Sequence, residues 1–138
     1  MDLKLSCLLL PVITVACSTA PLDPFGRPYD EANLMKPQPM SNCRAASGMD
    51  EPPFLKFGSQ PVYPVHSHIL ARDGLAKVVF RVGKDGTLSV EEYTTPDTVW
   101  FANHAAIAMR DWKVTPAMRA GVPVEAQCVI EFQYTIRR

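Results

Sequence analysis

Hydrophobic and polar residues alternate along two stretches in the second half of the chain, residues 75–82 and 126–136. A period of two is typical of a β-strand with one buried face. Residues 87–94 are expected to form another strand after an Asp85–Gly86 turn, since Asp-Gly tolerates the positive φ that tight hairpins need. The expected buried faces are Ala76, Val78, Phe80 and Val82 in the first strand, and Cys128, Ile130, Phe132, Tyr134 and Ile136 in the last.

A helical period lies between the second and the last of these strands. Residues 96–98 provide a break and an N-cap, and Pro116 prevents continuation. Apolar residues at spacings of three and four predict an amphipathic helix over one face of the sheet: Phe101, Ala105, Ala108, Met109 and Trp112. The order strand, strand, helix, strand predicts an α+β fold. Its three-stranded antiparallel sheet places the last strand beside the first.

The front of the chain has a different composition. Most of the thirteen prolines lie between Pro21 and Pro64, where no helical or alternating period is present. Residues 65–72 could form a short helix before Gly74. We therefore divide the chain into a signal peptide (1–16), a proline-rich linker or loosely ordered arm (17–57) and one domain (58–138).

The first residues are typical of an export signal. Lys4 precedes about a dozen mostly apolar residues, which fits a signal segment better than a span of about 20. Residues 14–18 resemble the lipobox of bacterial lipoproteins, which implies a lipid on Cys17. Ser18 after that cysteine favours delivery to the outer membrane. The alternative is a plain signal peptide cleaved near Ala16 or Ala20.

Export determines how the cysteines are interpreted. Cys7 would leave with the signal and Cys17 would carry the lipid, so Cys43 and Cys128 remain as an even pair in an oxidising compartment. We predict a Cys43–Cys128 disulfide, with a stabilisation of up to roughly 4.5 kcal/mol. The alternative is two free thiols.

No residues form a convincing catalytic or metal site. The formal net charge is zero and no Lys/Arg run is present, which argues against nucleic-acid binding. His66, His68 and His104 are more often solvated or packing residues than metal ligands. At helical spacing, residues such as Phe101 and Trp112 are more often part of the core than of a ligand pocket. We expect no enzyme activity, no cofactor and no metal.

The succession of short motifs in residues 58–138 is similar to the C-terminal domain of TonB, the periplasmic module that binds outer-membrane receptors. The motifs are Tyr63-Pro64, Gly74, Val78, Phe80, Asp85-Gly86, Ala105-Ala106, Trp112, Pro116-Ala117, Gly121, Pro123-Val124 and Phe132. The resemblance implies that the last strand adds a short receptor peptide to its edge. The residues it implies for partner binding are Gln127, Val129, Glu131 and Gln133, with Gln60, Pro61 and Tyr63 as a second contact. Tyr63 could instead cover the core.

The N-terminus departs from the family, because an energy transducer needs a transmembrane helix there. We therefore expect a non-catalytic periplasmic lipoprotein, tethered to the outer membrane through Cys17. It would bind an outer-membrane receptor or another envelope protein by strand addition. One alternative is a true transducer whose N-terminal segment stays uncleaved as an anchor. Another is a structural envelope lipoprotein whose sheet edge pairs with a neighbour or, as a homodimer, with itself.

Overall fold

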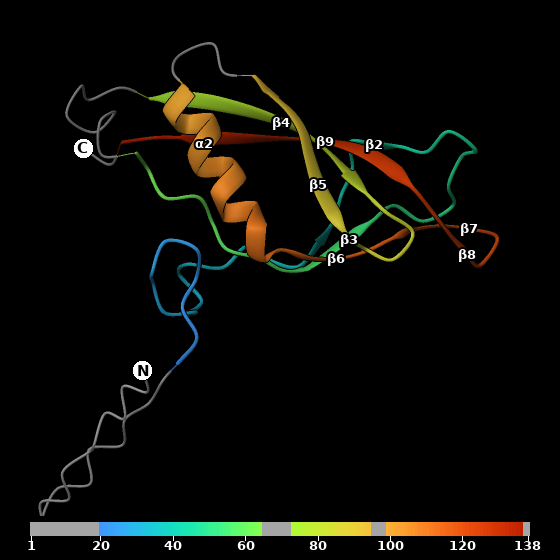
Figure 1. Cartoon of the computed structure of the whole chain (residues 1–138), viewed down its shortest axis with the longest axis horizontal. Helices are drawn as coiled ribbons and strands as arrows, with labels where there is room; N and C mark the ends of the chain where they lie inside the picture. The colour runs from blue at the N-terminus through green and yellow to red at the C-terminus, as the bar shows by residue number, and fades with distance from the viewer. Residues whose placement is uncertain (1–19, 65–72, 95–98, 137–138) are drawn as a thin grey trace, which may run out of the picture.

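The structure is a computed structural model that describes residues 20–64, 73–94 and 99–136 (Figure 1). The predicted signal peptide with Cys7 and Cys17, the short helix at 65–72 and the N-cap at 96–98 lie outside the described residues. So do His66 and His68.

The main sheet contains the three predicted strands and one more (Figure 1). Its order is β2–β9–β4–β5, with all neighbours antiparallel. The bounds are β2 Cys43–Arg44, β4 Gly74–Val82, β5 Leu88–Thr94 and β9 Ala126–Tyr134. The last strand β9 lies beside β4 over nine residue pairs, from Gly74–Tyr134 to Val82–Ala126. The α+β fold is therefore confirmed, and the two-residue strand β2 is an addition to it.

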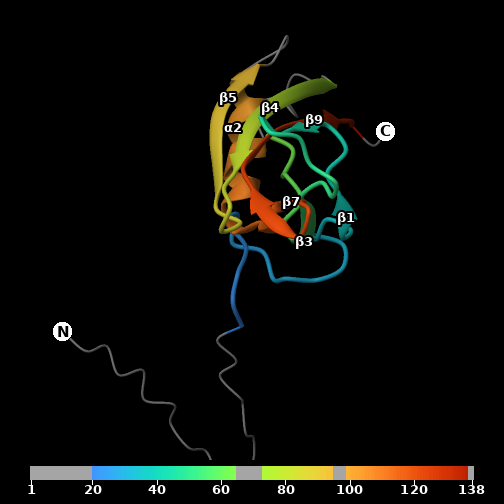
Figure 2. The same cartoon turned by 90° about the vertical axis from the view of Figure 1, so that its right-hand side faces the viewer.

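One helix covers a face of this sheet (Figures 1 and 2). The α-helix α2 spans Val99–Ala108 and continues into the 3-10 helix η1 at Met109–Asp111. The five residues predicted to face the sheet are all buried, and Ala102 is buried with them. The Tyr134 hydroxyl of β9 also donates to the Phe101 carbonyl of α2 at 2.8 Å. The helix is therefore attached to the end of β9 by a hydrogen bond as well as by packing.

Among the described residues, five further strands are too short for sequence periodicity to detect. β1 (Gln38–Pro39), β3 (Phe54–Phe57) and β6 (Lys113–Thr115) form a second antiparallel sheet in the order β1–β3–β6. β7 (Ala117–Arg119) and β8 (Val122–Val124) form a hairpin. Its turn uses left-handed backbone at Ala120 and Gly121, with φ of 48° and 76°. Strands of two to four residues give no usable hydrophobic period.

The proline-rich segment differs from the expected loose arm. From Asp23 onward it forms hydrogen bonds to the domain and within itself, and its strand β3 pairs with β6. Met40 is buried in the main core, and its N–H donates to the Pro53 carbonyl at 2.8 Å. The sequence boundary between residues 57 and 58 therefore marks no break in packing. The bonds of this segment are scattered rather than periodic, so the sequence pattern does not predict them.

Candidate functional site

The backbone of β9 presents alternate residues to its two neighbours. The Val129 N–H points away from β4 and donates to the Asn42 carbonyl at 2.9 Å. Because the pattern repeats every two residues in an antiparallel strand, the backbone groups of Gln127, Glu131 and Gln133 point to the same side. We call this side the outer edge of β9. The four residues of the outer edge are those that the sequence analysis selected for partner binding.

The first half of the outer edge is covered by β2. Cys43 lies opposite Cys128 and Arg44 lies opposite Gln127. The Cys43 and Cys128 sulfurs form a disulfide, and their Cα atoms are 4.0 Å apart. This confirms the disulfide predicted from the sequence. Since Cys128 is buried in the core, the bond attaches β2 to the interior of the domain as well as to the edge.

The second half, which we call the open half-edge, comprises Ile130–Tyr134. Within the described part of the chain, no strand pairs with Glu131 or Gln133 on the side away from β4. Two cavities of about 250 and 210 Å³ lie along it. The first is lined by Gln38, Pro39, Met40, Ser41, Asn42, Leu55, Phe80, Val129, Ile130 and Glu131. The second is lined by Met35, Gln60, Pro61, Phe132, Gln133 and Tyr134.

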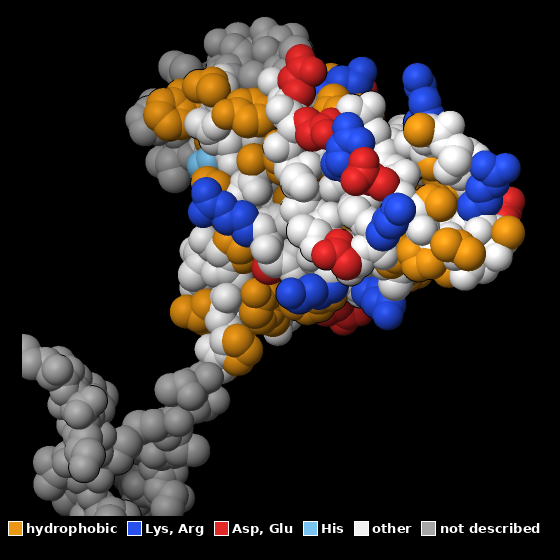
Figure 3. Space-filling view, turned by 45° about the vertical axis from the view of Figure 1, so that its right-hand side comes forward, with side chains coloured by type: hydrophobic (Ala, Val, Ile, Leu, Met, Phe, Trp, Pro, Cys, Tyr) orange, Lys and Arg blue, Asp and Glu red, His pale blue; other side chains and the backbone are white. Residues whose placement is uncertain are grey.

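Side chains of the outer-edge residues lie on the exposed face of the sheet. The Glu131 carboxylate lies 3.6 Å from the Lys77 ammonium, and both side chains are half exposed. The Gln127 amide donates to Glu91 Oε2 at 2.7 Å. Acidic and basic side chains are also interspersed on the surface that Figure 3 shows. The open half-edge therefore offers backbone groups at its rim, while its polar side chains are directed to solvent.

The predicted second contact is held in place by the arm. Gln60 donates its N–H to the Asn33 carbonyl at 2.8 Å and its side-chain amide to the Leu34 carbonyl at 2.7 Å. Its own carbonyl accepts from Arg27 at 2.7 Å. The backbone N–H, the carbonyl and the side-chain nitrogen of Gln60 are thus already engaged, and Gln60 and Pro61 both line the second cavity.

Tyr63 packs against the core. Its ring centroid lies 5.7 Å from that of Phe101 and 6.2 Å from that of Tyr134, both in edge-on geometry. Such contacts are favourable for aromatic rings. The structure therefore places Tyr63 as a cover for the core, and a contact between this residue and a partner stays a prediction.

Arg27 is positioned by Asp23. The Asp23 carboxylate accepts from the Phe25 N–H at 2.9 Å, the Arg27 N–H at 2.7 Å and Arg27 Nε at 2.6 Å. Burial acts to raise the pKa of Asp23, but the hydrogen bonds from Arg27 and Phe25 outweigh it and hold that pKa below its usual value. The carboxylate is therefore charged at neutral pH, and it keeps Arg27 directed at Gln60.

A partly buried polar cluster centred on Asp111 fixes the segment beside the open half-edge. Asp111 accepts from the Ser59 N–H at 3.0 Å, from the Ser59 hydroxyl, and from the Tyr29 hydroxyl at 3.0 Å. The Trp112 indole donates to the Ser59 carbonyl at 3.0 Å. A Cβ on Gly58 would lie 2.3 Å from that ring, so only glycine permits this approach. Burial and the bond to Asp111 raise the pKa of Tyr29.

The sequence pattern did not predict Asp111, Asn42 or Met35 as parts of this region. Their positions depend on contacts distant in sequence. The disulfide predicted at the neighbouring Cys43 is the one sequence feature that indicates a position near β9 for Asn42. Among the described residues, no three His, Cys, Asp or Glu side chains gather as metal ligands. His104 Nδ1 lies 2.8 Å from the Val62 carbonyl. The helices in the described ranges are all too short or too polar to cross a membrane.

Comparison with known proteins gives one family match. Residues 59–136 match the model of the family described as Gram-negative bacterial TonB protein C-terminal. Among solved structures, a match is found to the solution NMR structure of the Pseudomonas aeruginosa TonB C-terminal domain. The identity is 23% and the TM-score 0.49, over 71% of this chain and 90% of that chain. Comparison with curated proteins finds no significant match.

Proposed function

The chain belongs to the family of Gram-negative bacterial TonB C-terminal domains, and from this membership we propose that it binds an extended peptide at the open half-edge. Domains of this family are non-catalytic protein-interaction modules linked to outer-membrane transport. The partner would be a periplasmic segment of an outer-membrane receptor or of another envelope protein.

The proposal rests on one observation, the open backbone groups of Glu131 and Gln133. Their outward backbone groups have no strand partner within the described residues, and two cavities lie beside them. In strand addition, main-chain hydrogen bonds supply affinity and side-chain pockets supply selectivity. Apolar side chains of the peptide would enter the cavities lined by Leu55 and Phe80, and by Pro61 and Phe132.

The extent of the open half-edge limits the length of peptide that can pair with it. Strand β2 already pairs with Gln127 and Cys128, and Asn42 bonds to Val129. About four or five peptide residues fit along the remaining length, at about 3.4 Å per residue. A few hydrogen bonds of about 0.5–1.5 kcal/mol each, less the cost of ordering, give an affinity near the micromolar range.

The lipid tether at Cys17 is the second part of the proposal. Contact with the domain begins at Phe25, whose ring centroid lies 5.6 Å from that of His104. An extended segment from Cys17 to Phe25 spans at most about 28 Å. A domain tethered in this way stays close to its membrane. This favours partners in the periplasmic face of that same membrane. Palmitate labelling that depends on Cys17 would support the tether, and an uncleaved N-terminus would favour the anchored transducer.

The experiment is site-specific photocrosslinking in intact cells. A photoreactive residue at Gln133 is expected to capture an outer-membrane protein. The matched control position is Val122, which is exposed on β8 and distant in the fold from the open half-edge. Capture of a second copy of this chain at Gln133 would favour the structural alternative. Equal capture from both positions would contradict edge binding.

A further inference from the structure

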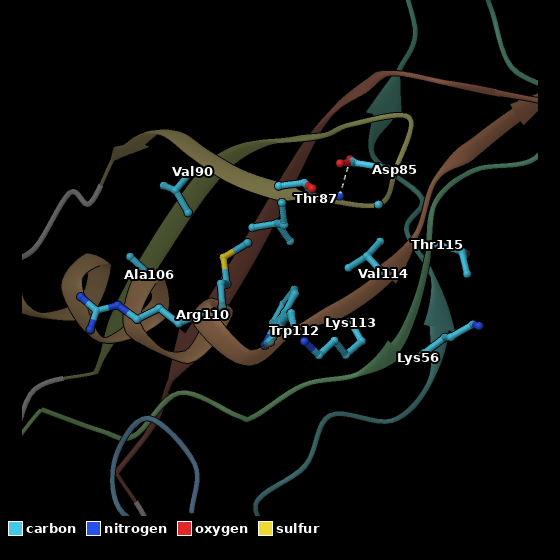
Figure 4. Close-up of a pocket in the computed structure, with 13 residues that line it drawn as sticks. Lys56, Asp85, Thr87, Val90, Ala106, Arg110, Trp112, Lys113, Val114 and Thr115 are labelled. Carbon is cyan, nitrogen blue, oxygen red and sulfur yellow. Dashed lines mark hydrogen bonds between the residues drawn. The ribbon is translucent and has the colours of Figure 1, made fainter.

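A groove lies beside β5, the strand at the opposite edge of the main sheet from β2 and the outer edge of β9. Figure 4 shows the residues that line it. It has a volume of about 780 Å³ and is bounded by β5, by the end of α2 with η1, and by β6. β5 and β6 are each last in the order of their sheet, so each has one side without a strand partner among the described residues. Residues of both strands line the groove.

The floor of this groove is apolar. Leu88 and Val90 come from β5, Met109 comes from η1 and Val114 comes from β6, while Trp112 follows η1 in the chain. Figure 4 shows Val90, Trp112 and Val114 around the groove. Trp112 and Met109 are almost fully buried, so only small parts of them are open to the groove.

The turn between β4 and β5 closes one end of the groove. Gly86 has a φ of 83°, which favours glycine, and a Cβ there would lie 2.6 Å from the Val114 carbonyl oxygen. The other end opens toward Ala106 and Arg110 (Figure 4). A bound chain would therefore run along the groove from the open end.

The rim of the groove is positively charged. Lys56, Arg110 and Lys113 line it and are exposed, and within the described ranges none of the three forms a salt bridge. Among the described residues that line the groove, only Asp85 is acidic, and its carboxylate already accepts from the Thr87 N–H at 3.0 Å. By contrast, Arg81 on the exposed sheet face is paired with two glutamates. The excess of positive charge suits an anionic ligand.

We propose that this groove binds an extended, acidic segment of another polypeptide. Apolar side chains of the segment contact Leu88, Val90 and Trp112, while its carboxylates lie near Arg110 and Lys113. The unpaired sides of β5 and β6 offer backbone groups to an extended chain. This site is independent of the open half-edge, so one domain could hold two partners or two parts of one partner.

The test uses an acetylated, amidated heptapeptide of alternating glutamate and valine, with a glutamine-for-glutamate peptide as the matched probe. The chain has two tryptophans, so the Trp100→Phe variant leaves Trp112 as the only indole reporter. Titration of the acidic peptide into that variant is expected to change Trp112 fluorescence saturably. The glutamine peptide is expected to bind about fivefold more weakly at low salt, as the loss of two exposed ion pairs implies.

The variant Arg110→Gln/Lys113→Gln is expected to weaken binding of the acidic peptide by about fivefold as well. The control variant Arg44→Gln/Arg119→Gln removes two exposed charges outside the groove and is expected to bind like the parent. Glu131→Pro, at the opposite edge, should also leave this binding unchanged. Melting temperatures verify that each variant is folded. Equal binding of both peptides, equal loss in the control, or no response from Trp112 would overturn the proposal.

Discussion

The two halves of the outer edge of β9 have the same backbone pattern but different surroundings. At Gln127 and Cys128 the edge is covered by β2, which the Cys43–Cys128 disulfide holds in place. At Glu131 and Gln133 no strand covers it in the described structure, and two cavities lie alongside. An exposed strand edge can pair with other chains and cause aggregation, and it can also serve as a binding surface. Strand β2, which the disulfide attaches to β9, therefore limits how much of the edge is available.

The disulfide should have the largest effect on stability. Cys43→Ser removes a bond between residues 85 positions apart, so we expect a loss of about 3–4 kcal/mol under oxidising conditions. Denaturant unfolding of the parent and the variant measures this loss of stability. In reductant the two proteins should unfold at the same midpoint. A variant as stable as the oxidised parent would show that β2 is held by its other contacts.

Proline substitution should separate the two halves of the edge. Glu131→Pro removes an outward N–H that has no strand partner among the described residues, so the fold should survive and peptide affinity should fall about tenfold or more. Val129→Pro removes the N–H that donates to Asn42, so its main cost should be stability. Calorimetric titration with receptor plug peptides, together with melting curves, compares the two. Unchanged binding by folded Glu131→Pro would exclude edge pairing at that residue.

Tyr134 attaches the far end of the open half-edge to α2. Tyr134→Phe removes the hydrogen bond to the Phe101 carbonyl and should cost about 1 kcal/mol at neutral pH. Burial raises the pKa of Tyr134 in the folded state, whereas an unfolded tyrosine ionises near pH 10. Unfolding therefore releases a proton above about pH 10, and stability falls as the pH rises.

The pH dependence provides the control for this substitution. Urea unfolding at a series of pH values above 9 should show a shallower decline for Tyr134→Phe than for the parent. Some decline should remain, because the pKa of Tyr29 is also raised. Parallel declines would show that Tyr134 is not protected from ionisation.

Peptide length should have the smallest effect. In the oxidised parent, extending a bound peptide beyond Val129 should gain nothing, because β2 occupies that part of the edge. In Cys43→Ala the same extension should strengthen binding about threefold, roughly the worth of one hydrogen bond. Affinities of a short and a long peptide for both proteins give the comparison. A gain from length in the oxidised parent would contradict the role of β2.

The sequence predicted the elements that have a clear period. Alternation in 75–82 and 126–136 located β4 and β9, and the spacing of Phe101, Ala105 and Trp112 located α2. The sequence also predicted the disulfide, through export and cysteine count. It could not predict β2 as a strand, because two residues have no period. For the same reason it placed the whole of Gln127–Gln133 on an open edge, whereas β2 pairs with Gln127 in the structure.

Amide hydrogen exchange at the outer edge tests the central claim most directly. In the free protein, the amides of Glu131 and Gln133 should exchange quickly, while that of Val129 should be protected by its bond to Asn42. Addition of a receptor plug peptide should slow exchange at Glu131 and Gln133 and leave Val129 unchanged. Slow exchange at Glu131 and Gln133 without peptide, or no change when peptide is bound, would contradict the account.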